Sequence, residues 1–295
     1  MKKWFAVASP FVFLGISLVS ANSADKLAPL ADSLRALEFT GETPDSYIGF
    51  DRNDYPGDEN LRELHKTFAY AGYWLNNPPG SKTNSWAGKR SKVEAAGFGF
   101  LVLFNGRLYR ELGPNPAELG RSDAHAAVAA ARREGFPPRT IIFLDQEEGG
   151  RLLPEQKAYL FAWVDEIGRA GFRAGVYCSG IAFGEKGDTN VMTAEDIRQN
   201  AGQRDLTYWV ANDACPPSPG CAMSRPRPVP KDSGVGFAAV WQFAQSPKRK
   251  DVALSCPGYD QDGSCYASAT AGRQKLYLDL NVANSADPSH GRSRK

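Results

Sequence analysis

The chain has 295 residues, 42% of them hydrophobic and 23% charged, with 35 Lys and Arg against 33 Asp and Glu. This is the composition of a globular protein, and the near-neutral charge removes the electrostatic basis for a nucleic-acid partner. Because there are three histidines, and five cysteines without C-x-x-C spacing, we expect no metal or other cofactor and no Ser-His or Cys-His catalysis.

The first 24 residues have the layout of a secretory signal peptide. Lys2 and Lys3 precede an apolar segment over residues 4–19, and small residues follow up to Ala24. Pro10 interrupts a segment that is already short for a membrane span, so cleaved export is favoured over an anchor. Cleavage would remove two basic residues and no acid. We therefore expect a secreted or periplasmic monomer with no membrane contact after signal cleavage.

A polar lead-in covers residues 25–46, and strand-like and helix-like patterns alternate from Tyr47 onward. Eight candidate strands cover residues 47–51, 68–75, 98–105, 140–147, 173–179, 206–212, 238–244 and 276–282. The clearest helices are residues 122–134, with Ser122 as the N-cap, and residues 154–169, with Pro154 in the first turn.

This alternation predicts an α/β fold in which helices cover a parallel sheet. Eight strands fit a single (β/α)8 TIM barrel over residues 47–284 better than an open sheet, and no G-x-G-x-x-G follows the first strand. Residues 285–295 are expected to form a disordered basic tail.

The connections after the sixth and seventh strands are long, lack clear helix patterns and carry four of the five cysteines. The simplest disulfide pairing is local within each loop, Cys215 with Cys221 and Cys256 with Cys265. Cys178 lies in an apolar run and is expected to be a buried free thiol.

Acids gather where the predicted strands end, which is where a barrel of this type carries its active site. The apolar run 141–144 ends in Asp145, Gln146, Glu147 and Glu148, and strand alternation places Asp145 and Glu147 on the same face. Asp51 and Asp279 add acids from the first and last strands. Ion pairs, helix caps or a solvent-facing strand end would account for one or two of these acids, but less well for all of them.

Clustered carboxyl groups are what glycoside hydrolysis requires. One acid must donate a proton to the leaving oxygen, while an ionised carboxylate stabilises or attacks the sugar. Crowding raises the pKa values of neighbouring carboxyl groups, which helps one of them to stay protonated.

The remaining strand ends supply aromatic rings and amides. Rings could stack on sugars and amides could bind hydroxyl or acetamido groups, although barrel packing and loop turns are the competing explanations. The candidates are Trp74, Tyr177, Trp209 and Trp241, with the amides Asn76, Asn105, Asn212, Gln242 and Asn281.

The order of these motifs over residues 47–283 resembles the glycoside-hydrolase-like barrels of the DUF1906 type, which are related in layout to family 25 lysozymes. The resemblance rests on residues 49–51, 123–135, 141–147, 174–177, 208–211, 241–243 and 279–281. It implies N-acetylmuramidase chemistry with Glu147 as the general acid, Asp145 as its companion, and Asp51 and Asp279 as supporting acids. We place Asp51 with the catalytic residues and Asp279 with those that bind substrate.

The leading hypothesis is thus a secreted hydrolase of peptidoglycan or a related polysaccharide. Because the family includes members with no assigned activity, a glycan-binding barrel without turnover is the alternative. A metal-dependent phosphodiesterase on the same fold is least favoured, since histidine ligands are scarce.

Overall fold

The computed structural model describes residues 46–185, 189–222, 227–248, 254–268 and 275–293, and the structural statements below concern these residues. The predicted signal peptide, residues 1–24, and all but the last residue of the predicted lead-in lie outside them.

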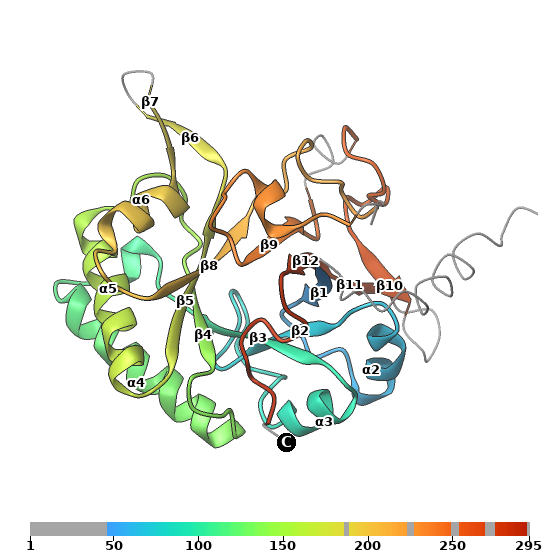
Figure 1. Cartoon of the computed structure of the whole chain (residues 1–295), viewed down its shortest axis with the longest axis horizontal. Helices are drawn as coiled ribbons and strands as arrows, with labels where there is room; N and C mark the ends of the chain where they lie inside the picture. Colours follow the sequence, from blue (N-terminus) through green and yellow to red (C-terminus); the bar gives the residue numbers. More distant parts are fainter. Residues whose placement is uncertain (1–45, 186–188, 223–226, 249–253, 269–274, 294–295) are drawn as a thin grey trace, which may run out of the picture. The chain divides into compact units, whose positions relative to one another are not determined.

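Eight strands close into a barrel. They are β1 (Tyr47–Asp51), β2 (Tyr70–Trp74), β3 (Gly99–Asn105), β4 (Ile141–Asp145), β5 (Arg173–Ser179), β8 (Leu206–Ala211), β9 (Val240–Ala244) and β12 (Asp279–Ala283). Around the barrel the order is β1-β12-β9-β8-β5-β4-β3-β2 (Figure 1). The predicted closed α/β barrel is confirmed.

The expectation of a fully parallel sheet is wrong for β12, which runs antiparallel to both β1 and β9. In the register of β1 with β12, Asp51 lies opposite Asp279. The reason lies in the connection from β9 to β12, because the described part of it contains no helix that would return the chain to the opposite end of the barrel. The start of β12 therefore meets the carboxyl end of β1.

Five helices accompany the sheet: α2 (Asp58–His65), α3 (Arg90–Ala95), α4 (Pro116–Glu134), α5 (Pro154–Arg169) and α6 (Thr193–Asn200). Short 3-10 turns lie at η1 (Tyr109–Glu111) and η2 (Pro230–Ser233). The helix α5 has its predicted bounds. The N-cap prediction for Ser122 is wrong, because α4 begins at Pro116, a residue preorganised for the first helical turn.

The barrel interior alternates glycines with large rings. A Cβ on Gly49 would overlap the Tyr70 ring, and a Cβ on Gly175 would overlap the Phe143 ring. Phe143 in turn packs edge-on against Trp209, with ring centroids 6.0 Å apart. Rings therefore fill the space that the glycines leave, so the barrel interior below its carboxyl end is packed with side chains.

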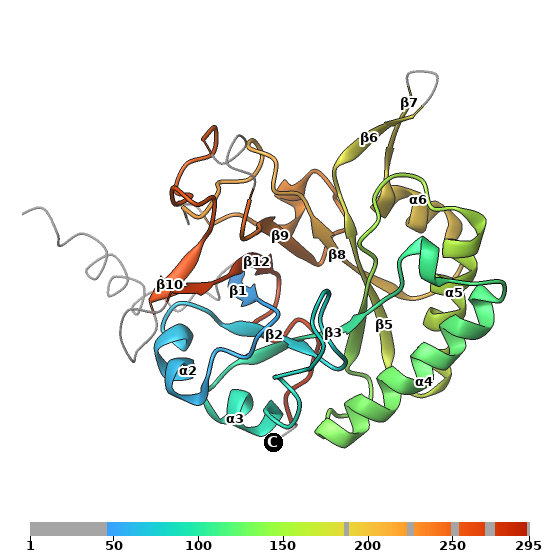
Figure 2. The same ribbon diagram turned by 180° about the vertical axis from the view of Figure 1, so that it is seen from behind.

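Residues 285–293 differ from the predicted disordered tail. Ser289 is fully buried and its hydroxyl accepts a hydrogen bond from the Val102 amide at 2.8 Å. The Ser289 carbonyl accepts the Ile141 amide at 2.8 Å, and Asp287 accepts the Phe100 amide at 2.9 Å. Because the segment satisfies backbone donors of β3 and β4, it is held against the barrel (Figure 2).

The predicted local disulfides are also wrong. Cys215 pairs with Cys256 and Cys221 pairs with Cys265, with Cα atoms 5.5 Å apart in both pairs. The loop after β8 therefore lies beside the loop after β9, within disulfide reach, and each bond crosses from one loop to the other. Cys178 is buried and free, as predicted.

Two hairpins lie outside the barrel sheet. One consists of β6 (Ala182–Glu185) and β7 (Thr189–Met192), and the other of β10 (Tyr266–Ser268) and β11 (Lys275–Tyr277). The β6–β7 hairpin projects from the carboxyl end of β5 (Figure 1). In the described parts of the chain, no helix is both long enough and apolar enough to cross a bilayer.

Candidate active site

The inward-facing residues at the carboxyl ends of the parallel strands surround a cavity of about 190 Å³. Alternation along each strand brings Asp51, Trp74, Asp145, Tyr177, Trp209 and Gln242 to this face. The lining also includes Asn53, Pro79, Leu103, Glu147, Gln245 and Asp279. Four carboxyl groups thus meet in one small cavity.

Asp51 is held by two amides. Asn281 donates to its Oδ1 at 2.7 Å and Gln242 donates to the same oxygen at 3.0 Å. Burial raises the pKa of Asp51 to about 6, while these two hydrogen bonds lower it and the charge of Glu147 raises it further. The two donors therefore favour the ionised form of a carboxyl group that burial makes harder to ionise.

Asp145 lies deeper in protein and is 4% exposed. Its Oδ1 atom is fully buried and receives no hydrogen bond in the described part of the molecule. Burial, followed by the charges of Glu147 and Asp51, raises the pKa of Asp145 well above its ordinary value. Asp145 therefore holds its proton more tightly than an ordinary carboxyl group.

Glu147 is the exposed acid of the group and stands two residues beyond the end of β4. Partial loss of hydration against the cavity wall raises its pKa. Its neighbour Glu148 is engaged elsewhere, because its Oε2 accepts the Tyr109 amide and the Gln156 side chain, both at 2.7 Å. Of the two adjacent glutamates, only Glu147 lines the cavity.

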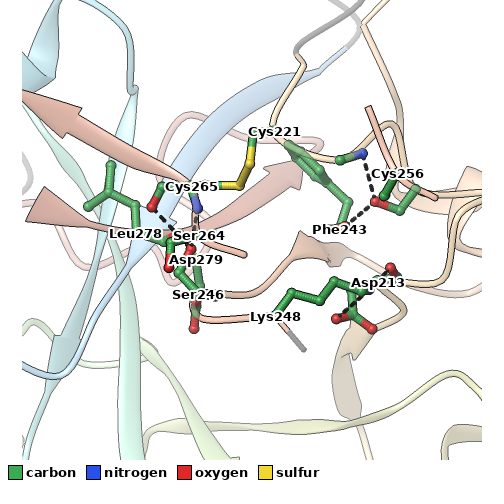
Figure 3. Close-up of a disulfide and its surroundings, with 12 residues drawn as sticks. Asp213, Cys221, Phe243, Ser246, Lys248, Cys256, Ser264, Cys265, Leu278 and Asp279 are labelled. Atoms are coloured by element: carbon green, nitrogen blue, oxygen red, sulfur yellow. Dashed lines mark hydrogen bonds and ion pairs between the residues drawn. A yellow bond between two sulfur atoms is a disulfide. The ribbon is translucent and has the colours of Figure 1, made fainter. Parts of the chain in front are cut away.

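Asp279 enters the cavity from the first residue of β12. Its Oδ1 accepts the Ser246 amide at 2.6 Å, and burial together with the charge of Asp51 raises its pKa well above its ordinary value. The Ser246 hydroxyl is itself hydrogen-bonded to the amide and carbonyl of Cys265 (Figure 3). The Cys221–Cys265 disulfide is thus connected to an acid of the site.

A second polar chain crosses the cavity from Tyr177. Its hydroxyl donates to Gln242 Oε1 at 2.7 Å, and Gln245 donates to both Tyr177 and Gln242. Trp209 donates to Asn281 Oδ1 at 2.9 Å, so the donor of Asp51 is itself oriented. These contacts fix the side chains around Asp51 before any ligand is present.

Five predicted binding residues do not line the cavity, and one of them, Asn76, donates instead to the Asn105 carbonyl at 3.0 Å. Trp241 is fully buried on the outer face of β9, with its indole donating to the Asn212 carbonyl at 2.8 Å. Asn212 donates to the Ser233 carbonyl, and Asn105 donates to the Asn77 carbonyl. Asn281 is fully buried and contacts Asp51 instead. Trp241 precedes Gln242 directly, so strand alternation prevents both from facing the cavity.

The sequence interpretation missed Asn53 and Gln245, two amides that line the cavity one or two residues beyond a strand end. Their position just after an inward-facing strand residue was the available signal. In the described ranges, no group of three or more His, Cys, Asp or Glu residues is arranged to hold a metal ion.

The closed α/β barrel and the acids at the carboxyl ends of its strands are the fold and the cluster of residues that a glycoside-hydrolase-like barrel has. The model of the Rv2525c-like, glycoside hydrolase-like domain matches residues 67–222, and the chain belongs to this family. This match confirms the predicted DUF1906 relationship.

Solved structures resemble the chain at low sequence identity. An uncharacterized protein of B. stearothermophilus has a TM-score of 0.50 and 19% identity, over 80% of this chain and 95% of that chain, and this likeness supports the fold. The spore cortex lytic enzyme SleM of Clostridium perfringens has a TM-score of 0.49 and 15% sequence identity, over 83% of this chain and 70% of that chain. The Tat-secreted protein Rv2525c of Mycobacterium tuberculosis has a TM-score of 0.47 and 13% sequence identity, over 84% of this chain and 98% of that chain. No curated protein matches the chain.

Proposed function

We propose that this protein is an exported glycoside hydrolase that cleaves peptidoglycan or a related polysaccharide by carboxylate acid/base chemistry. The observation that carries the proposal is the pairing of two kinds of acid in one cavity. The pKa values of Asp51, Asp145 and Glu147 are all raised. Two amide donors favour the carboxylate form of Asp51, whereas the buried Oδ1 atom of Asp145 receives no hydrogen bond in the described part of the molecule. Glycosidic cleavage requires one carboxyl group that donates a proton and one that acts as a carboxylate, and different hydrogen-bond environments within one cavity suit such a division of roles.

Each acid has a distinct role in this proposal. Glu147 is the general acid, because it is the exposed carboxyl group and its raised pKa favours the protonated form that transfers a proton to the leaving oxygen. Asp51 is the carboxylate that stabilises positive charge on the sugar. Asp145 is the buried companion, and its reluctance to ionise limits the negative charge in the cavity.

The cavity wall suits an N-acetylated sugar. The buried rings of Trp74 and Trp209 form part of the wall, and Asn53 and Gln245 offer amides for hydroxyl or acetamido groups. The resemblance to family 25 lysozymes directs the choice toward peptidoglycan. Two disulfides favour an oxidising compartment, in agreement with the predicted signal peptide.

The test replaces Glu147 with Gln and measures release of soluble fragments from purified peptidoglycan. Loss of a general acid is expected to lower the rate by a factor of about 10² to 10⁴. Glu148→Gln is the matched control. It should keep the wild-type rate, because a glutamine oxygen can still accept the Tyr109 amide and the Gln156 side chain.

Absence of release by the wild-type protein, across several wall preparations and pH values, would contradict hydrolysis. If the wild-type protein releases no fragments but still sediments with peptidoglycan, and Glu147→Gln does not weaken this binding, the glycan-binding alternative is correct.

A further inference from the structure

Exposed apolar side chains gather around the segment that carries Glu147. We call residues 146–153, which join β4 to α5, the acid loop. Among the described residues six large hydrophobic side chains are exposed, and three belong to this region: Tyr109, Leu153 and Phe183. The Tyr109 amide donates to Glu148 of the loop, Leu153 is its last residue, and Phe183 reaches it from the β6–β7 hairpin.

Phe183 contacts the acid loop directly. A Cβ on Gly149 would overlap the edge of the Phe183 ring, so this ring lies against the bare backbone of Gly149. An ion pair between Arg151 and Glu185, 3.2 Å long, ties the same hairpin to the same loop. Gly149 is two residues from Glu147, so their Cα atoms are at most about 7 Å apart.

The Phe183 ring nevertheless remains open to solvent, since the residue is 42% exposed. The acid cavity, at about 190 Å³, is smaller than the several hundred Å³ of an ordinary small-molecule site. A polysaccharide that places one unit in this cavity must therefore lay its neighbouring units on the surrounding surface. An exposed aromatic ring against Gly149, two residues from Glu147, supplies apolar surface for the C–H face of such a unit.

We propose that Phe183 is an aromatic platform on which the sugar adjacent to the cleaved unit packs, so that the β6–β7 hairpin helps to select polymeric N-acetylhexosamine substrates. This inference rests on the proposed function for the position of the substrate. It extends that function by a specificity-determining residue outside the acid cavity.

The experiment measures binding without turnover, in a Glu147→Gln background. Isothermal titration with β-1,4-linked N-acetylglucosamine oligomers of two, four and six units gives the dependence of affinity on length. Phe183→Ala is expected to weaken binding of the longer oligomers by about tenfold, the size of one good aromatic contact, and to leave the shortest unchanged. Phe183→Trp should restore the affinity, which a merely destabilised hairpin would not do.

Tyr266→Ala is the matched control. Tyr266 is also an exposed aromatic residue of a hairpin, but the Lys275 ammonium already lies 4.1 Å from its ring centroid. Its removal should leave the dependence on length unchanged.

Gly149→Ala tests the contact itself. The added Cβ must displace the Phe183 ring, so this variant should reproduce the loss seen with Phe183→Ala. In the double variant the two losses should not add, because both act through one ring.

The outcomes separate this inference from the proposed function. If the wild-type protein releases wall fragments but Phe183→Ala binds every oligomer normally, the platform is wrong and hydrolysis stands. If Phe183→Ala weakens the longer oligomers while the wild-type protein releases nothing, the platform stands and hydrolysis is wrong. Failure of the Glu147→Gln protein to bind any of the oligomers would overturn the platform.

Discussion

At the scale of single residues, the acid cavity contains a carboxyl group, that of Asp145, whose burial costs stability at neutral pH. The Asp145 Oδ1 atom is buried and receives no hydrogen bond in the described part of the molecule. Burial makes ionisation of Asp145 unfavourable in the folded protein, whereas the unfolded chain ionises freely. The stability that Asp145 contributes is therefore present below its ordinary pKa of 3.8 and is lost as the pH rises through the raised pKa.

Replacement of Asp145 by Asn should accordingly stabilise the protein at neutral pH, by about 1–3 kcal/mol, because the neutral amide does not ionise in the unfolded state. Each kcal/mol corresponds to about 2–4 °C in Tm for a chain of this size. Thermal unfolding at pH 7 and near pH 3.5 checks the sign, since the gain should disappear in acid. An equal change in Tm at both pH values would show that ionisation is not the cause.

At the scale of secondary-structure elements, two chain segments complete the barrel in ways that the strand pattern does not indicate. Antiparallel β12 brings Asp279 opposite Asp51 at the carboxyl end. At the other end of the parallel strands, the segment 285–293 supplies hydrogen-bond partners to the first residues of β3 and β4. Both segments follow β9, so the last part of the chain contributes contacts at both ends of the barrel.

Ser289→Ala tests the second of these segments. The change leaves the Val102 amide buried without its partner, so the free energy of unfolding should fall by about 1–3 kcal/mol. Urea denaturation gives this value. Ser293→Ala, in the same segment but exposed, removes hydroxyl contacts with the Arg90 and Glu94 side chains, and Arg90 keeps the Gly291 carbonyl as a partner, so the change should be below about 1 kcal/mol. Equal effects of the two substitutions would mean that the buried hydrogen bond is not important.

At the scale of the whole molecule, the two disulfides join the loops that follow β8 and β9. Cys221 and Cys265 are 44 residues apart in sequence, and Cys265 is bonded through Ser246 to Asp279 (Figure 3). A nearby ion pair between Lys248 and Asp213, at 2.7 Å, also joins these loops. The joined loops thereby hold Asp279, an acid of the cavity, in position through Ser246.

Removal of this cross-link by the double substitution Cys221→Ser and Cys265→Ser should destabilise the protein by about 4 kcal/mol. It should also weaken glycan binding, because Ser246 loses a fixed position beside Asp279. Cys178→Ala, which removes only the free thiol, is the control for thiol loss and should leave binding unchanged. Peptide mapping without reduction should recover Cys215 joined to Cys256 and Cys221 joined to Cys265. Recovery of the local pairs would contradict the structure.

Local pattern was sufficient for much of the barrel and of its acidic end. The bounds of β1, β5 and α5 were predicted to the residue, because short apolar runs and a first-turn proline are local signals. Alternation along a strand expected to reach residue 147 favoured Glu147 over Glu148; β4 ends at Asp145, and only Glu147 of the two lines the cavity. The same alternation, applied to residues 241 and 242, would have excluded Trp241.

The sequence by itself therefore determined the fold class, the family and the group of acids from which a site can be built. Only the tertiary structure decided the direction of β12, the disulfide partners, the place of residues 285–293 and which amides contact Asp51. These features depend on contacts between residues far apart in the chain, and their geometry leaves no periodic signal in the sequence. The amide donors of Asp51 illustrate this, because Asn281 is 230 residues away and reaches Asp51 only after the barrel has closed.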